Sequence, residues 1–323
     1  MKILIVQNRK GIGDLIIFLP FIEALAKKFT TQVYLLVKEN SKAIDLIKNN
    51  KHVKEILILD RDNKTNNGLH DGINGSLKLI QYLKRYKFDK IFIFNSSLRF
   101  NLIAKFSLIK DIYQYPLFFK KNQNITETAK KFLKKKLDME VESNPEISLS
   151  EQDVKNIRVK NKISSNEKNI LLGIGGSGDT KRIPSSTFLK FMNYCSEKYK
   201  CRFFLATGKI KEEQDILNEI YNSKFKSQCL KLDDLRLDET LPYIKNCDIS
   251  ICNDSSFSHI SAALGLQTIV LMADTPIIYG SYSPKMHPII PEGVNEVGHN
   301  TLGKNKISAL EIYEKFETLI NKA

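Results

Sequence analysis

Short apolar runs rich in β-branched residues recur at near-regular intervals along this chain of 323 residues. Each run is continuous rather than alternating, which is typical of strands buried on both faces of a parallel sheet. The predicted strands cover residues 2–6, 32–37, 55–59 and 90–94, and then 169–174, 201–206, 228–232, 248–252 and 268–272. Stretches of helical period separate the strands, so the sequence predicts an α/β protein with a doubly wound sheet in each half.

The segment at residues 138–168 contains Pro145 and several Ser and Asn residues, and we interpret it as a linker. We therefore expect a Rossmann-like domain at residues 1–165 and a second one at 166–304. Two such domains would face each other across a ligand cleft at the carboxyl ends of their strands. Residues 305–323 are amphipathic and are expected to form a helix that packs back on the N-terminal domain.

Charge and composition narrow the class of protein. Lys and Arg number 50 and Asp and Glu 36, so the formal net charge of +14 favours anionic partners. The apolar runs are about five residues long, far below the roughly 18 that a membrane span requires. The N-terminus lacks the layout of a signal peptide, so we expect a cytoplasmic protein. The five cysteines are widely spaced, which argues against disulfides and a zinc site.

Gly11 and Gly13 lie between the first predicted strand and helix. Glycines at such a turn let backbone amides approach a ligand, and a helix N-terminus favours negative charge. A dinucleotide fingerprint would need a third glycine where this chain has Ile16. Asp14 has two interpretations: it is a cap or helix-dipole partner, or it is a carboxylate at the cleft that takes a proton.

A glycine-rich loop opens the second half in the equivalent position. It contains four glycines (Gly173, Gly175, Gly176, Gly178), two hydroxyls (Ser177, Thr180) and two cations (Lys181, Arg182). Between a buried strand and a helix, this composition predicts a cradle for phosphate oxygens. The alternative interpretation is a flexible, solvated loop.

A third constellation follows the predicted strand at 248–252. Asp254 or Ser255 is expected to cap the next helix, leaving free amides that could bind an anion. His259 lies one turn into this helix and either reaches the same site or makes a structural hydrogen bond. Residues 273–276 and 281–284 follow the next strand, so three loops should converge on one sheet edge.

Two further patterns have simpler interpretations. Asp60-Arg61-Asp62 matches the D-x-D tripeptide of metal-dependent sugar transferases, but we interpret it as a surface turn. A lysine run is predicted to be a solvated helix face, with contact to an acidic glycolipid or lipid headgroups as the alternative. Its members are Lys130, Lys131, Lys134, Lys135 and Lys136.

Together these motifs resemble the ADP-heptose:lipopolysaccharide heptosyltransferase-like glycosyltransferases, glycosyltransferase family 9, which have the GT-B fold. The matching residues are Ile12-Gly13-Asp14 with Pro20, Lys181-Arg182-Ile183-Pro184 for the family's Lys-Arg-Trp-Pro, and residues 254–265 for its D-[ST]-G-x-x-H-x-x-[AG]-A-L-G signature. Ile183 replaces the family's aromatic residue and Ser256 replaces its glycine. The donor sugar is therefore left open.

The resemblance implies metal-independent, inverting transfer of a sugar, heptose or a related one, from a nucleotide donor such as ADP-heptose. The acceptor would be lipopolysaccharide or another surface glycan, with no cofactor and no nucleic acid. It assigns Asp14 as the base and Lys181 as the cation that offsets charge on the leaving diphosphate. The implied donor-binding residues are Gly13, Gly175, Gly176, Ser177, Thr180, Arg182, Asp254, Ser255, Ser256 and His259. Acceptor contacts are expected from residues 60–75 and 95–101.

Two alternatives stay open. A nucleotide-sugar epimerase built on the same two-domain plan would need no acceptor. The other alternative is a basic protein that binds glycans or nucleic acid without turnover. The joint presence of Asp14, Lys181, Asp254 and His259 argues against it and favours an enzyme. For an enzyme, peripheral contact with the cytoplasmic face of the inner membrane is a further possibility.

Overall fold

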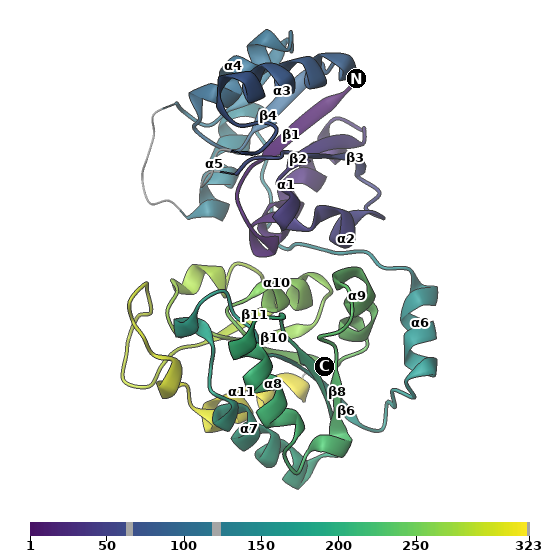
Figure 1. Cartoon of the computed structure of the whole chain (residues 1–323), viewed down its shortest axis with the longest axis vertical. Helices are drawn as coiled ribbons and strands as arrows, with labels where there is room; N and C mark the ends of the chain where they lie inside the picture. Colours follow the sequence, from purple (N-terminus) through teal and green to yellow (C-terminus); the bar gives the residue numbers. More distant parts are fainter. Residues whose placement is uncertain (63–66, 118–123, 322–323) are drawn as a thin grey trace. The chain divides into compact units, whose positions relative to one another are not determined.

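The computed structural model describes residues 1–62, 67–117 and 124–321, and the chain divides into two compact units, Met1–Pro145 and Glu146–Ala323 (Figure 1). Each unit contains one parallel sheet with helices between its strands. The prediction of two doubly wound α/β halves is therefore confirmed. No helix within the described ranges is long and apolar enough to cross a membrane.

The first unit has the strand order β3-β2-β1-β4-β5. Its elements are β1 (Ile3–Gln7), α1 (Ile12–Lys28), β2 (Val33–Val37), η1 (Glu39–Ser41), α2 (Ala43–Ile47), β3 (Val53–Ile58), α3 (Gly72–Tyr86), β4 (Lys90–Ile93), α4 (Leu98–Phe106), β5 (Asp111–Gln114) and α5 (Ile125–Leu137). All five residues of β1 are buried, as expected for a central strand. Gln7 pairs with Val37 and Val6 with Ile93, so these strands end at one edge.

The second unit has the strand order β11-β10-β9-β6-β7-β8. Its strands are β6 (Lys168–Gly173), β7 (Cys201–Ala206), β8 (Cys229–Lys231), β9 (Ile249–Asn253), β10 (Gln267–Leu271) and β11 (Met286–Ile289). Its helices are α6 (Glu151–Lys160), α7 (Ser185–Lys198), α8 (Lys211–Tyr221), α9 (Leu237–Lys245), α10 (Ser256–Ala263) and α11 (Ala309–Ile320). Short 3₁₀-helices are η2 (Asp179–Lys181), η3 (Lys226–Gln228), η4 (Ile277–Tyr279) and η5 (Lys304–Lys306).

Two strands and part of the linker differ from the prediction. The edge strands β5 and β11 were not predicted, because they are short and β11 contains Pro288, which a parallel sheet tolerates at its edge. The segment predicted as a linker contains α6, which packs beside α9 through a hydrogen bond from Asn246 to the carbonyl of Val154 (2.9 Å) (Figure 1). The second unit therefore begins about 20 residues earlier than the expected boundary.

The last helix belongs to the second unit rather than packing back on the N-terminal one. The apolar side chains of Ile312, Phe316 and Leu319 are buried in the core of the second unit. The rings of Phe316 and Phe191 on α7 lie 5.8 Å apart, edge to face. The amphipathic pattern correctly predicted a helix with one buried face, but it did not identify the surface that covers this face.

We expect Phe316→Ala to lower the free energy of unfolding of the second unit by about 3–5 kcal/mol, because it removes a fully buried ring. Leu310→Ala on the same helix is the matched control, since Leu310 is 50% exposed and its change should stay within about 1 kcal/mol. Urea unfolding followed by circular dichroism measures both. Equal effects would contradict this packing of α11.

Candidate functional site

Loops after three strands meet at the carboxyl edge of the second sheet. The strands β6, β9 and β10 are neighbours and all parallel, so the loops that follow them lie at the same edge. Lys181 in the loop after β6 contacts Asp254 after β9, and His259 on α10 contacts Tyr282, which follows β10. The predicted convergence of these loops is confirmed within this unit.

Lys181 and Asp254 form an ion pair, with 2.7 Å between Nζ and Oδ2. The Asp254 side chain is only 6% exposed, and burial by itself raises the pKa of its carboxyl group. The ammonium of Lys181, together with a hydrogen bond from Thr275 and the nearby His259, outweighs this effect, so the pKa of Asp254 lies below its ordinary value. The Asp254 carboxylate therefore stays charged and holds the Lys181 ammonium at the start of α10.

Ser255 is the N-cap residue of α10, but its side chain caps no backbone N–H, contrary to the sequence-based expectation. Its hydroxyl is buried and has no hydrogen-bond partner in the described part of the chain. An uncapped helix N-terminus has free amides, and Ser256 is the first residue of this helix. This combination leaves one hydroxyl and several amides available to an anionic ligand.

A buried carboxylate that sequence reasoning missed organises the glycine-rich loop. Glu213 on α8 accepts hydrogen bonds from the backbone N–H groups of Gly176 and Gly208, each at 2.7 Å, and from the Thr207 hydroxyl at 3.2 Å. A Cβ atom at Gly175 would lie 3.1 Å from the Glu213 carboxylate, so this glycine permits the close packing. The only sequence signal was an acidic residue in the first turn of a helix after a buried strand.

Several predicted phosphate ligands already have partners within the loop. The Gly176 N–H is bonded to Glu213, and Arg182, 9% exposed, donates to the Gly176 carbonyl at 3.2 Å. Thr180, another predicted ligand, hydrogen-bonds to the Asp274 carboxylate through its side chain. Burial alone would raise the pKa of Asp274, but this bond and one from the N–H of Leu302 lower it. Among the side chains of this loop, Ser177 is exposed and the Lys181 ammonium is partly accessible.

His259 makes a 2.8 Å hydrogen bond between Nδ1 and the hydroxyl of Tyr282. Burial lowers the pKa of His259 to about 4, so its imidazole is neutral near pH 7. This contact agrees with the structural interpretation of His259, which positions the loop at Tyr282.

In the first unit, Asp14 lies in the first turn of α1, directly after Gly13. Gly11 precedes the helix with φ of 102°, a conformation that favours glycine. Asp14 makes no capping bond; its Oδ1 accepts a hydrogen bond from Nε of Arg9 at 2.8 Å. Burial raises the pKa of Asp14, and Arg9 offsets only part of this effect, so Asp14 is a stronger base than an ordinary aspartate.

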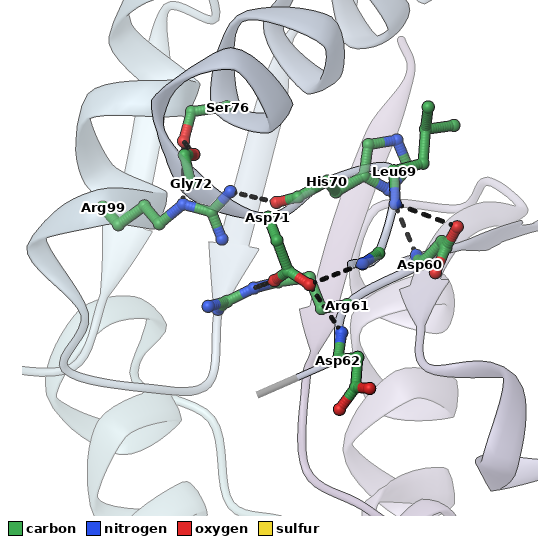
Figure 2. A network of polar contacts seen from close by, with 10 residues as sticks. Asp60, Arg61, Asp62, Leu69, His70, Asp71, Gly72, Ser76 and Arg99 are labelled. Carbon is green, nitrogen blue, oxygen red and sulfur yellow. Dashed lines mark hydrogen bonds and ion pairs between the residues drawn. The ribbon is translucent and has the colours of Figure 1, made fainter. Parts of the chain in front are cut away.

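The two loops expected to contact an acceptor lie side by side in the first unit (Figure 2). Arg99 at the start of α4 donates to the carbonyl of His70 and, at 2.9 Å, to the hydroxyl of Ser76. Residues 63–66 of the first loop lie outside the described residues.

The D-x-D tripeptide forms part of a turn that is closed by Asp71. Arg61 pairs with Asp71 at 3.1 Å, and the other oxygen of Asp71 accepts from the N–H groups of Asp62 and Gly68 (Figure 2). Asp60 accepts from the N–H of Leu69 at 3.1 Å. The residues described here contain no cluster of three potential metal ligands, and the interpretation of this tripeptide as a turn agrees with these contacts.

Residues 76–304 match the model of glycosyltransferase family 9 (heptosyltransferase), which covers well over half of the chain. The chain belongs to this family. The family 9 chain is 23% identical over 158 residues (48% of its length) to lipopolysaccharide heptosyltransferase 1 of Campylobacter coli. It is 30% identical over 202 residues (58% of its length) to lipooligosaccharide heptosyltransferase 2 of Campylobacter jejuni. These alignments span 46% and 59% of the two relatives.

A solved structure with the same architecture is the ADP-heptose LPS heptosyltransferase II of Escherichia coli. It aligns with a TM-score of 0.75 over 100% of this chain and 99% of that one, at 16% sequence identity. The family 9 chain therefore has the GT-B fold of these enzymes, as the sequence motifs led us to expect.

We expect Lys181→Met to raise the pKa of Asp254, because burial then acts without the ammonium. Carbon-13 NMR of the carboxyl groups measures this shift. The loss of a buried partner should also cost roughly 1–3 kcal/mol of stability. Lys190→Met, at an exposed position of α7, is the control. An unchanged Asp254 pKa in Lys181→Met would contradict the ion pair.

The Lys181–Asp254 pair also sets a pH dependence. The folded pKa of Asp254 lies below the unfolded value of 3.8, so its contribution to stability is present above about pH 4 and is lost as the pH falls through the folded pKa.

The titration of His259 affects stability over a higher pH range. Its pKa is about 4 in the folded chain and near 6.5 unfolded, so stability should fall as the pH drops from about 6.5 to 4. Urea unfolding at pH 7 and pH 5 should show a smaller difference for His259→Gln than for the wild type.

Proposed function

We propose that this protein is a glycosyltransferase that moves a sugar, heptose or a related one, from a nucleotide donor to lipopolysaccharide or a related glycan. The observation that carries the proposal is the partly buried Lys181–Asp254 pair beside the free Ser255 hydroxyl and the start of α10. A cation, a hydroxyl and a helix N-terminus together suit a diphosphate. Membership of family 9 supports the same chemistry.

On the donor side, the diphosphate would share the Lys181 ammonium with Asp254. The Ser255 hydroxyl and the amides of Ser256 and its neighbours would donate to the phosphate oxygens. As the bond to the sugar breaks, negative charge grows on the leaving diphosphate, and Lys181 stabilises this charge. We propose that this lysine takes the place of a metal ion and that the reaction needs no other cofactor.

On the acceptor side, we propose Asp14 as the general base. The acceptor oxygen bonds to the anomeric carbon, the bond from that carbon to the diphosphate oxygen breaks, and the hydroxyl proton passes to Asp14. A single displacement of this kind inverts the configuration at the anomeric carbon. The raised pKa of Asp14 supports this role, and Arg9 fixes the orientation of its carboxylate.

ADP-heptose is the first donor to test, because the solved relative from Escherichia coli is named for it. The names of the two Campylobacter relatives favour a lipopolysaccharide core as the acceptor. We propose that the enzyme is cytoplasmic and that such an acceptor brings it to the inner-membrane surface. The lysines of α5 suit this contact, since Phe132 and Leu133 face the core and a hollow of about 720 Å³ is bordered by Lys131, Lys135 and Lys136.

We expect Asp14→Asn to lower the transfer rate roughly 10²–10⁴-fold, because the acceptor proton loses its base. The thermal shift caused by ADP should stay as in the wild type. Release of ADP from ADP-heptose in the presence of heptose-deficient lipopolysaccharide measures the rate. Glu23→Gln, also on α1, is the matched control and should keep full activity. Equal rates in Asp14→Asn and the wild type would remove Asp14 from the mechanism.

A panel of nucleoside diphosphates and nucleotide sugars, read by thermal shift, identifies the donor before this assay, because a ligand of the folded state raises its stability. Conversion of the nucleotide sugar without an acceptor would indicate an epimerase instead. Binding of oligonucleotides that weakens steeply with salt, with no nucleotide-sugar affinity, would indicate a non-catalytic binder.

A further inference from the structure

A late segment, residues 300–304, is bound to the donor loop although more than 100 residues separate them along the chain. Lys304 at the start of η5 donates to the carboxylate of Asp179 at 2.8 Å and to the Asp179 carbonyl at 3.2 Å. Asp179 begins η2, the short helix that ends in Lys181. The late segment thus holds the backbone that carries the proposed phosphate ligand.

Asp274 makes a second connection from its position after β10. Its side chain accepts from the N–H of Leu302 at 2.9 Å, and Thr180 of η2 hydrogen-bonds to the same carboxylate. Asn300 and Leu302 have positive φ angles of 73° and 53°. Positive φ angles at every second residue can turn successive N–H groups toward one anion, here the Asp274 carboxylate. Because the single hydroxyl proton of Thr180 is used here, Thr180 supports the loop and has no hydroxyl proton left for phosphate.

The segment has little freedom to move away. The N–H of Gly303 donates to the carbonyl of Ala273 at 3.0 Å. A Cβ atom at Gly303 would lie 2.1 Å from Cγ of Pro291, so only glycine fits this position. The packing of Gly303 against Pro291 and the hydrogen bonds to Asp179 and Asp274 together fix residues 300–304 against the loop after β6.

We propose that residues 300–304 act as a strap that positions Lys181 for the diphosphate of the donor, with Asp274 and Lys304 as positioning residues. The ligand in this proposal rests on the proposed function. The Lys304–Asp179 pair is too exposed to add much to global stability, since 73% of the Asp179 side chain is accessible. Its effect is local: a loop that is ordered in advance binds phosphate at a lower entropic cost.

The test compares Lys304→Met with Lys306→Met, which changes an exposed lysine of the same 3₁₀-helix. Isothermal titration with ADP and with adenosine measures affinity, and amide hydrogen exchange measures the order of residues 177–183. For Lys304→Met we expect a roughly fivefold rise in the Kd for ADP, unchanged adenosine affinity, faster exchange at 177–183 and an unchanged melting temperature. Lys306→Met should match the wild type throughout.

The double variant Asp179→Asn/Lys304→Met separates positioning from charge. A strap predicts that the double variant stays as weak toward ADP as Lys304→Met. Recovery of wild-type affinity would mean that Lys304 only neutralises Asp179, and would overturn the proposal. Unchanged ADP affinity in Lys304→Met, or an equal loss for adenosine, would overturn it too.

The same experiment separates the strap from the proposed function. If the wild type bound neither ADP nor another nucleoside diphosphate, the proposed function would fail. Hydrogen exchange would then still decide the strap, because faster exchange at residues 177–183 in Lys304→Met, and not in Lys306→Met, requires no ligand.

Discussion

The partly buried ion pair between Lys181 and Asp254 is the interaction on which the candidate site depends. A buried carboxylate is costly without a partner, and a lysine on a loop has many conformations without one. The two residues stabilise each other. Lys181 keeps the Asp254 carboxylate charged, and Asp254 fixes the Lys181 ammonium beside the start of α10. The pair thus fixes a cation at the place where we propose that the donor diphosphate binds.

This pair forms because parallel strands end together. The neighbours β6 and β9 run in the same direction, so both strands end at the same edge of the sheet. Asp254, which follows β9, therefore reaches the loop that follows β6, although it lies 81 positions after Gly173 at the end of β6. The rest of the edge is ordered in the same way. Glu213 holds the amides of the glycine-rich loop, Tyr282 holds His259, and Asp274 holds the segment at Leu302. Most polar groups at this edge therefore support others, and few remain free for a ligand.

Several motif residues that were predicted to bind the donor instead hydrogen-bond to other groups of the protein. Gly176, Thr180 and Arg182 were predicted to bind phosphate from their residue types, but in the folded chain they bond to Glu213, Asp274 and the loop carbonyl. Asp254 or Ser255 was predicted to cap α10, yet the Ser255 hydroxyl is unpartnered among the described residues. Composition identified loops that the fold brings together, and the direction of each hydrogen bond depended on residues far away in the chain.

The sequence by itself determined the central strands and the edge at which the loops meet, because continuous apolar runs and helical periods reflect local conformation and burial. It also placed Asp14 at the start of a helix and Lys181 and Asp254 in strand-end loops, since these positions follow from strand boundaries. Only the tertiary structure decided that α11 packs on α7, that Glu213 occupies the loop, and that Lys304 reaches Asp179. These contacts join segments distant along the chain, and no local pattern specifies which distant partner a buried face or charge will meet.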